Sequence, residues 1–408
     1  MSKILLLTEG NLSNNFAGPG MRYFEFARAL AKKHQVTLAG LSFDPDFSSP
    51  DVNVLKISAF NVINLGIKIS VPNSFFRKEL TKYDLIITPG GALRSFGSLT
   101  KIKTPIAIDL YNPWFFEMMS SGRSPNKKKI TQNIKKVVEI IKEGNYFICA
   151  SSKQRDLYIG LMLAAEKIDP EKLKIDPLLE DLIAVVPTGI PSTPPKANKK
   201  SLRSECPEIK ESDKVVIWWG GMWDWLDPIT LIKAIDIISR KRKDVKLVFF
   251  GADPLTAKDF SSKTVADSVE LSKKLNLYQK QIYFISRWIP YAERANWLLD
   301  ADIGIISHHK SLETEFSWRT RAMDYLWAGL PIITTEGDSI AALVEKHSLG
   351  RVVPYQNAKS MAEAILAILE NPRDHERIKE NIQRFSPSLY WENIVVPIHN
   401  FCKKLIRK

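Results

Sequence analysis

The chain alternates short apolar runs with longer stretches of helical periodicity, and this alternation limits most strongly what it can fold into. Ile4–Leu7 and Val36–Leu41 have the length and composition of buried strands, and an amphipathic stretch from about Met21 to Lys33 lies between them. Repeated βα units of this kind form parallel sheets covered by helices. We therefore expect an α/β protein.

A change in composition divides this alternation into two series. Pro191–Pro195 leads into a polar, lysine-rich segment that ends near Asp213 and shows no apolar periodicity. A second series of strands begins at Val215–Trp219. With 408 residues, the chain also exceeds one ordinary core, since a domain takes about 150 residues. We predict two doubly wound domains, over residues 1–195 and 214–385, a linker over 196–213 and a last helical segment over 386–408.

The composition excludes several classes of protein. Hydrophobic residues make up 45% and charged residues 25% of the chain, as in a soluble globular protein. No apolar run approaches the roughly 20 residues needed to cross a bilayer, and the N-terminus lacks the pattern of a signal peptide, so we expect a cytoplasmic protein. Three cysteines in so long a chain exclude a disulfide framework, and no spacing of His or Cys predicts a metal site.

The net charge of +13 has three candidate explanations: nucleic acid, an anionic membrane surface or a phosphate-bearing substrate. The basic residues are dispersed and no nucleic-acid-binding module is visible, so we predict no nucleic-acid partner. Lysine runs at 127–129, 135–136 and 403–408 leave peripheral association with the inner face of a membrane open. A solvated surface is the commoner meaning of such runs.

The most specific motif runs from Trp318 to Ile333, where a basic loop leads into a helix with one acid, then a Gly-Leu-Pro turn and an apolar strand. A helix N-terminus carries about half a positive charge and unpaired amides, so it can hold phosphate without a metal. Arg319 or Arg321 could add a bidentate contact. Asp324, one turn further on, could accept both hydroxyls of a ribose, although helix capping alone would also explain it.

This motif resembles the donor-binding signature of retaining GT-B glycosyltransferases of family 4, the group 1 type. The resemblance implies two Rossmann-like domains facing each other across a cleft. It implies a metal-independent glycosyltransferase of class EC 2.4 that needs no cofactor and uses a nucleoside-diphosphate sugar as donor. By the same resemblance, Arg321 is a catalytic residue at the diphosphate, Asp324 binds the ribose and Tyr325 belongs to the donor site.

Three further stretches match parts of the family's site. Gly20 and Met21 belong to a glycine loop between the first strand and the first helix, which the resemblance places at the donor. Asp109 follows an apolar strand and is the second predicted catalytic residue, orienting the acceptor hydroxyl or the donor hexose; capping of the next turn is the alternative. Arg287 and Trp288 match the turn that contacts the nucleobase, with Trp288 either stacked on the base or buried in the core.

The chain departs from the family after the first strand of its second domain. Aligned on Gly221, Met222 stands at the usual arginine and Asp227 at the usual lysine, so both customary diphosphate cations are missing. Either another arginine supplies the charge, or the donor binds unusually with weak or absent turnover. The candidate arginines are Arg287, Arg319 and Arg321.

The same stretch is rich in tryptophan and carries another acid. Asp224 could hydrogen-bond sugar hydroxyls, and the tryptophans either stack on a sugar or base or pack the core; they stand at positions 218, 219, 223 and 225. A second departure concerns the glutamate pair that many members carry eight residues apart, because Phe316 stands eight residues before Asp324.

Two alternatives share this architecture. A sugar-nucleotide 2-epimerase would convert its substrate without an acceptor, and a non-catalytic sugar-nucleotide-binding subunit would support a partner transferase and bind without turnover. The favoured prediction is a transferase of glycan, polysaccharide or glycoconjugate biosynthesis. Its acceptor would be a glycan, a lipid-linked molecule or a small molecule.

Overall fold

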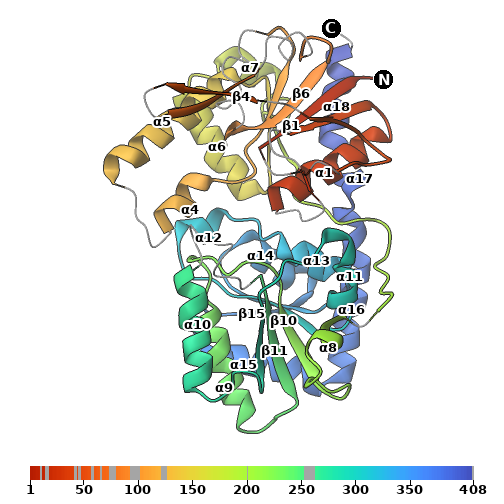
Figure 1. Cartoon of the computed structure of the whole chain (residues 1–408). Coiled ribbons are helices and arrows are strands. Elements are labelled where there is room, and N and C mark those ends of the chain that lie inside the picture. Colours follow the sequence, from red (N-terminus) through yellow and green to blue (C-terminus); the bar gives the residue numbers. More distant parts are fainter. Residues whose placement is uncertain are drawn as a thin grey trace. The chain divides into compact units, whose positions relative to one another are not determined.

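The computed structural model contains two compact units (Figure 1). The first comprises Met1–Phe115, Asn126–Gly189 and Trp391–Lys408, and the second comprises Phe116–Pro125 and Ile190–Tyr390. The structure describes residues 1–9, 12–13, 18–40, 44, 47–56, 59–64, 67–72, 80–91, 102–120, 126–199, 201–251 and 262–406.

A parallel sheet forms the centre of the first unit. Ile4 pairs with Val36 on one side and with Leu85 on the other, and every residue of β1 after Lys3 is buried, as expected for a strand covered on both faces. Among the described residues the strand order is β3-β2-β1-β6-β7-β8-β9. The bounds are β1 Lys3–Thr8, β2 Gln35–Gly40, β3 Asn53–Lys56, β6 Leu85–Pro89, β7 Ile106–Asp109, β8 Tyr146–Cys149 and β9 Ile183–Val185; β4 Ala59–Asn64 and β5 Ile67–Pro72 form a separate antiparallel pair.

Helices from both ends of the chain pack in the first unit. The indole of Trp391 meets the ring of Phe26 edge-on, with centroids 5.5 Å apart, and Phe401 stacks on Tyr146 at 4.1 Å. The C-terminal segment from Trp391 onward is therefore part of this unit. The helices are α1 Gly18–Ala31, α5 Lys127–Glu143, α6 Ser152–Ala164, α7 Pro170–Ile175, α17 Trp391–Ile394 and α18 Val396–Ile406; α4 Trp114–Ser120 contains residues of both units.

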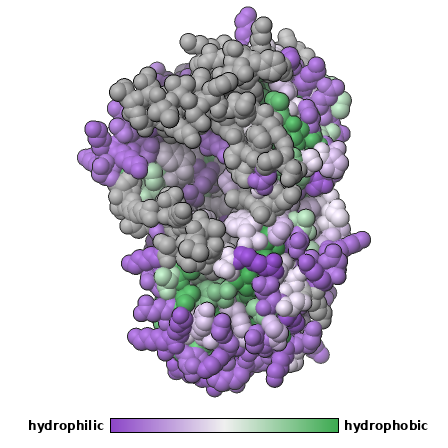
Figure 2. All heavy atoms as spheres, viewed as in Figure 1, coloured by the Kyte–Doolittle hydropathy of each residue, from purple (hydrophilic) through white to green (hydrophobic). Residues whose placement is uncertain are grey.

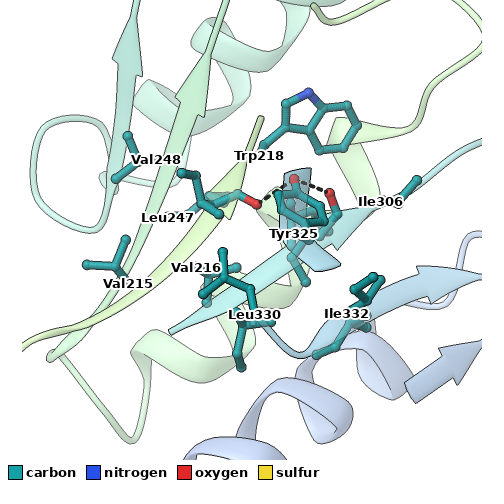
Figure 3. Close-up of a cluster of buried hydrophobic side chains, with 14 of the residues drawn as sticks. Val215, Val216, Trp218, Leu247, Val248, Ile306, Tyr325, Leu330 and Ile332 are labelled. Atoms are coloured by element: carbon teal, nitrogen blue, oxygen red, sulfur yellow. Dashed lines mark hydrogen bonds between the residues drawn. The ribbon is translucent and has the colours of Figure 1, made fainter. Parts of the chain in front are cut away.

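The second unit is built on another parallel sheet. Val216 pairs with Leu247 on one side and with Ile303 on the other, and the apolar residues of these central strands are fully buried. Figure 3 shows part of this core around β10 and β13. The strand order is β12-β11-β10-β13-β14-β15, with bounds β10 Lys214–Trp218, β11 Val245–Phe250, β12 Ile282–Ile285, β13 Ile303–Ile306, β14 Ile332–Thr335 and β15 Gly350–Val353.

Local capping explains where the helices of the second unit begin. The first of its long helices starts at Pro228, because Asp227 accepts a hydrogen bond from the backbone N–H of Thr230 at 3.0 Å and proline suits the first helical position. The helices are α8 Ser201–Glu205, α9 Pro228–Ser239, α10 Ser262–Lys274, α11 Ala295–Leu298, α12 Leu312–Phe316, α13 Arg321–Trp327, α14 Ser339–His347, α15 Ala358–Glu370 and α16 Pro372–Phe385, with 3-10 turns η2 Tyr291–Glu293 and η3 Ser386–Leu389.

The structure corrects our expectation for residues 196–213, which we predicted to be a linker without core elements. Leu202, Cys206 and Ile209 are buried in the core of the second unit, and this unit begins at Ile190. The three apolar residues are spaced four and three apart, which suits one face of a helix and its exit. The surrounding lysines and glutamates concealed this short pattern.

Figure 2 shows hydrophilic residues over much of the surface of the second unit that is visible in this view. Lys127, Lys128, Lys129 and Lys135 on α5 are exposed, and no carboxylate of the described residues lies within ion-pair distance of them. None of the helices in the described parts of the chain is long and apolar enough to pass through a membrane.

Candidate functional site

The predicted donor residues follow the carboxyl ends of the central strands of the second unit, the edge where such sheets bind ligands. The chain leaves β10 through Gly220, whose φ of 91° suits glycine because a side chain would be strained there. Gly251, at the end of β11, also has a left-handed φ of 64°, and a Cβ there would lie 3.1 Å from the backbone of Gly220 and Gly221. The two turns after neighbouring strands therefore pack directly against each other.

Asp324, in the first turn of α13, is held by two hydrogen-bond donors from other elements. The indole Nε1 of Trp219 donates to Oδ2 at 3.0 Å, and Nε of Arg294 donates to Oδ1 at 3.0 Å. The Asp324 side chain keeps 22% exposure, whereas that of Arg294 keeps 7%. Burial raises the pKa of Asp324, and the charge of Arg294 opposes that rise. The site thus presents an oriented carboxylate with one accessible side.

Arg321 begins the same helix and is a partly buried cation. Its Nη2 donates to the carbonyl oxygen of Gly221 at 2.7 Å, and its guanidinium lies 4.7 Å from the ring centroid of Trp218. Its Nη1 is buried without a hydrogen-bond partner, and no carboxylate of the described chain pairs with it. Burial lowers the pKa of Arg321 to about 10. Such a group is well suited to meet an anion. Gly221, predicted at the donor, orients this arginine through its carbonyl.

Arg319 differs from Arg321 although only one residue separates them. It forms a bidentate ion pair with Glu313, with Nη1–Oε1 and Nη2–Oε2 distances of 2.8 and 2.7 Å, and both side chains are buried. Its Nε also lies 3.5 Å from Oδ2 of Asp338. The charge of Arg319 is therefore already neutralised inside the unit. These contacts support a structural role for Arg319, and its role as a donor-binding cation stays a prediction.

Tyr325, predicted in the donor site, lies in the core with 0% exposure (Figure 3). Its hydroxyl accepts from the backbone N–H of Trp219 at 2.9 Å and lies 3.1 and 3.0 Å from the carbonyl oxygens of Ile217 and Ile305. The phenol thereby joins β10 to β13. A Cβ on Gly304 would lie 2.4 Å from its ring, so the glycine makes room for it. No face of Tyr325 remains for a ligand, which corrects the prediction.

The missing diphosphate cations have a structural explanation. Met222 is fully buried in the core of the second unit. Asp227 is also buried and caps α9, with its carboxylate 3.0 Å from the N–H and 2.6 Å from the hydroxyl of Thr230. One position has become part of the core and the other a helix cap. Neither can supply positive charge to a ligand.

The tryptophans near Gly221 have different surroundings. Trp218 is fully buried, whereas Trp219 is partly buried and packs against Phe250 at a centroid distance of 4.9 Å. Trp223 and Trp225 stack on each other at 5.8 Å. Core packing thus explains Trp218, and the other three keep partial exposure.

Three more predicted donor residues lie nearer the surface of the second unit. Asp224 accepts a hydrogen bond from the hydroxyl of Thr264 at 3.0 Å. Arg287 is exposed and pairs with Glu205 at 2.9 Å, so it is a surface ion pair. Trp288 is 46% exposed, which is not core burial. Stacking of Trp288 on a base remains a prediction.

Asp109, the second predicted catalytic residue, is only 5% exposed and lies at the end of β7 in the first unit. It forms a two-point ion pair with Arg22, at 2.9 Å to Nε and 3.2 Å to Nη2, and accepts from the N–H of Tyr111 at 3.1 Å. Gly20 and Met21 belong to the first turn of α1, not to a loop, and both are buried. The contacts of Asp109 favour a structural ion pair between α1 and β7. Residues 14–17, before α1, lie outside the described residues.

In the described parts of the chain, no three His, Cys, Asp or Glu side chains converge as metal ligands would. His308 and His309 do not act as a pair: the imidazole Nε2 of His308 lies 3.0 Å from the carbonyl oxygen of Glu336, and burial lowers the pKa of His308 well below its usual value. Metal independence stays a prediction.

Comparison with known proteins agrees with the position of this site. Residues 213–371, which lie inside the second unit, match the family described as glycosyl transferases group 1. Residues 213–371 of the second unit are therefore similar to a group 1 glycosyl transferase domain. The resemblance found in the Trp318–Ile333 motif is thereby confirmed. No curated protein sequence matches this chain.

Solved structures of the same fold match the whole chain or nearly all of it. Sucrose-phosphate synthase of Thermosynechococcus elongatus has a TM-score of 0.71 at 15% identity, covering 100% of both chains. HepE of Anabaena, in complex with UDP-glucose, has a TM-score of 0.71 at 16% identity and the same coverage. WaaG, a glycosyltransferase involved in lipopolysaccharide biosynthesis, has a TM-score of 0.63 at 14% identity, covering 97% of this chain and 98% of its own. The predicted GT-B fold class is confirmed.

The sequence did not indicate two features of the second unit, Arg294 beside Asp324 and the Glu313–Arg319 pair. Arg294 lies 30 positions before Asp324 and belongs to no motif. Its one local signal is its place directly before the apolar stretch of α11, where Ala295, Trp297 and Leu298 are buried. The pairing of Arg319 depends on tertiary burial of Glu313 and has no sequence signature that separates it from Arg321.

Proposed function

We propose that this chain is a retaining glycosyltransferase that moves a sugar from a nucleoside-diphosphate sugar to an acceptor hydroxyl without a metal ion. One observation carries the proposal. Within the region that is similar to a group 1 glycosyl transferase domain, α13 combines a partly buried arginine that no described carboxylate neutralises with an oriented, partly exposed carboxylate one turn later. Cation and acid at this spacing suit the diphosphate and the ribose of one nucleotide.

Each group of the site has a defined part in this reaction. Asp324 accepts the two ribose hydroxyls, and Arg321 together with the start of α13 holds the diphosphate. As the bond between the anomeric carbon and the phosphate oxygen breaks, negative charge grows on the departing diphosphate, and Arg321 stabilises it. The acceptor oxygen bonds to the anomeric carbon from the same face, and its proton passes to the departing phosphate. We assign the acceptor to the first unit.

This chain is unusual in the residues that are available to provide positive charge at the diphosphate. The two customary cationic positions hold a core methionine and a helix-capping aspartate, and Arg319 is committed to Glu313. Arg321 is therefore the main source of positive charge at the diphosphate. These substitutions also support a second candidate function, a non-catalytic nucleotide-sugar-binding subunit of a partner transferase. It predicts binding of the donor without hydrolysis or transfer by the isolated chain.

The first donors to try are uridine nucleotides. Structures of HepE hold UDP and UDP-glucose, and its fold matches this chain at full length. At 16% identity the likeness extends to the fold alone, so the panel should include other nucleoside-diphosphate sugars. We propose a glycan, a lipid-linked molecule or a small molecule as the acceptor.

We further propose that the protein works in the cytoplasm and associates with the inner face of a membrane through α5. The exposed lysines at its start carry this proposal. Replacing Lys127, Lys128 and Lys129 by Gln should reduce co-sedimentation with phosphatidylglycerol vesicles. Matched changes at Lys233, Lys241 and Lys243 of the second unit should not. Equal binding of both triple variants would contradict a role for α5.

Thermal shift with a panel of nucleoside-diphosphate sugars tests the donor site, since a ligand that binds the folded state raises the melting temperature. We expect one nucleotide class to stabilise the wild type but neither Asp324→Asn nor Arg321→Gln. Arg240→Gln is the matched control, because Arg240 is an exposed arginine of the same unit that pairs with Asp236. No stabilisation by any nucleotide sugar, or equal stabilisation of all four proteins, would overturn the proposal. Transfer of the sugar to water or to an acceptor then separates the enzyme from the binding subunit.

A further inference from the structure

Asp324 is fixed from two sides, and this restricts how it can meet a ligand. Each carboxylate oxygen receives one N–H, Oδ2 from Trp219 and Oδ1 from Arg294. Rotation of the carboxylate would break both bonds. An ionised carboxylate has about four lone-pair sites, so two remain on the exposed side of Asp324. The fixed geometry therefore leaves room for two further donors, the number that a ribose diol offers.

The donors are themselves immobilised. The Arg294 guanidinium lies between the rings of Tyr291 and Trp327, at 3.6 and 4.0 Å from their centroids, and its Nη1 donates to the carbonyl oxygen of Tyr291 at 2.7 Å. A cation stacked between two rings is held in place by both. Trp219 is anchored through its backbone N–H, which donates to the Tyr325 hydroxyl.

We propose that Arg294 and Trp219 are positioning residues that aim Asp324 at the ribose of a nucleoside diphosphate and keep it ionised to a lower pH than burial alone would allow, so that nucleotide binding persists to lower pH. This inference rests on the proposed donor site. It adds two residues, from η2–α11 and from the exit of β10, that act on the nucleotide only through Asp324.

The direction of the pH effect follows from the contacts. A carboxylate accepts two hydroxyl protons only while ionised, so nucleotide affinity is full above the pKa of Asp324 and falls as the pH drops through it. Burial raises this pKa, while the charge of Arg294 and the hydrogen bonds from Arg294 and Trp219 lower it. Removing Arg294 leaves burial unopposed, so the loss of affinity should begin at higher pH. Removing the Trp219 donor should have a smaller effect in the same direction.

Other charged groups around Asp324 do not replace Arg294. Arg321 lies one turn earlier on α13 and donates to the Gly221 carbonyl, and burial raises the pKa of the neighbouring Tyr325 phenol far above the neutral range. Glu293, next to Arg294 in the chain, pairs with Lys199 at 3.2 Å. These groups stay the same in every variant proposed below.

The test is the dissociation constant of UDP measured across the acid and neutral range for five proteins. They are the wild type, Arg294→Met, Arg294→Lys, Trp219→Phe and Asp324→Asn; Arg240→Met serves as an exposed-arginine control. Protonation of the UDP phosphates affects all proteins equally, so it cancels when each variant is compared with the wild type. Asp324→Asn, which has no carboxylate at this position, should bind weakly at every pH. If another nucleoside diphosphate stabilises the wild type better in the thermal shift panel, it replaces UDP.

We expect Arg294→Met to move the acid loss of affinity upward by at least about one pH unit, which is about tenfold weaker binding at a pH on the falling limb. Arg294→Lys should restore part of the shift, and Trp219→Phe should show a smaller one. Thermal denaturation of each variant monitors folding. If Arg294→Met does not fold, Trp219→Phe and Arg294→Lys still carry the test.

An unchanged pH profile in Arg294→Met and Trp219→Phe would overturn the inference, even if affinity fell uniformly, because a merely structural role lowers affinity at every pH. Failure of the wild type to bind any nucleoside diphosphate would instead overturn the proposed donor site, and this inference with it. The two failures are therefore distinguishable.

Discussion

Each unit places a carboxylate beyond a parallel strand and an arginine beside it, but the two arrangements differ in what they leave accessible. In the first unit, Arg22 covers both oxygens of Asp109, and the two side chains keep 1% and 2% exposure. In the second unit, Asp324 is held from behind by two donors and keeps 22% exposure. The residue types are alike, although Asp109 ends strand β7 and Asp324 lies in the first turn of helix α13. The two carboxylates differ in how their partners cover them. In the structural ion pair the arginine covers both oxygens of Asp109, whereas the partners of Asp324 leave part of its carboxylate accessible to a ligand.

The same lesson separates Arg319 from Arg321. Arg319 is buried and Arg321 partly buried, yet Glu313 neutralises Arg319, while Arg321 pairs with no carboxylate of the described residues. Replacing Arg319, on which the buried carboxylate of Glu313 depends, should therefore lower stability. Replacing Arg321, which pairs with no described carboxylate, should instead lower ligand affinity. The predictions below test this contrast, beginning with the largest effect.

Breaking the buried Arg22–Asp109 ion pair of the first unit should have the largest effect on stability. Arg22→Met leaves Asp109 buried and unpaired, which should lower the free energy of unfolding by about 3–5 kcal/mol. Equilibrium urea denaturation measures this. Lys174→Met, which breaks an exposed pair with Glu171, should cost less than about 1 kcal/mol. Similar stabilities of the two variants would show that Asp109 does not depend on Arg22.

Arg321→Gln should spare most of the stability and weaken binding of a nucleoside diphosphate by about 10- to 100-fold, because hydrogen bonds to a charged group contribute about 1.5–3 kcal/mol. Arg319→Gln should do the reverse, since it strands Glu313. Calorimetric titration of both variants measures the change in nucleotide affinity, and denaturation measures the change in stability. If Arg319→Gln is the variant that loses binding while remaining as stable as wild type, the assignment of the two arginines is inverted.

Tyr325→Phe should cost about 1–3 kcal/mol of stability, because it leaves the N–H of Trp219 and the carbonyls of Ile217 and Ile305 without their buried partner. Thermal denaturation measures this loss. If the variant had wild-type stability but did not bind nucleotide, Tyr325 would have to be assigned to the donor site.

Asp227→Ala should destabilise the protein by about 1 kcal/mol through the lost cap of α9, and Asp227→Asn should recover most of it. If Asp227→Lys, which restores the family's usual cation, strengthens nucleotide binding instead, the position faces the ligand as well as the helix. Urea denaturation and calorimetric titration distinguish these outcomes.

Arg287→Gln should have the smallest effect, within about 0.5 kcal/mol of wild-type stability, because its pair with Glu205 is exposed. Nucleotide affinity should also stay within about twofold. A tenfold loss of affinity would show that the loop after β12 contacts the donor through this side chain.

The fold could be predicted from the sequence because its signals are local. The run Ile4–Leu7 corresponds to β1, and Val215–Trp219 corresponds to β10 within one residue. Both are short apolar runs that need burial on two faces, so parallel sheets follow from them. The core residues of 196–213 escaped notice because their three apolar positions are diluted by charged neighbours.

The candidate site could be predicted only in part. The sequence located Arg321 and Asp324, since both lie in one continuous motif. It could not identify Arg294, which reaches Asp324 from 30 positions away, nor the commitment of Arg319 to Glu313. It also placed Tyr325 at the ligand, although the hydroxyl serves two strands. These relations depend on which atoms burial brings together, and that is decided by packing.

The most direct measurement of the account is a calorimetric titration of the best stabilising nucleoside-diphosphate sugar into Asp324→Asn and Asp109→Asn, beside the wild type. Both changes replace a carboxylate by its isosteric amide at the end of a βα unit. The account predicts that Asp324→Asn loses donor binding and that folded Asp109→Asn binds like the wild type. Loss of binding in Asp109→Asn with full binding in Asp324→Asn would contradict it.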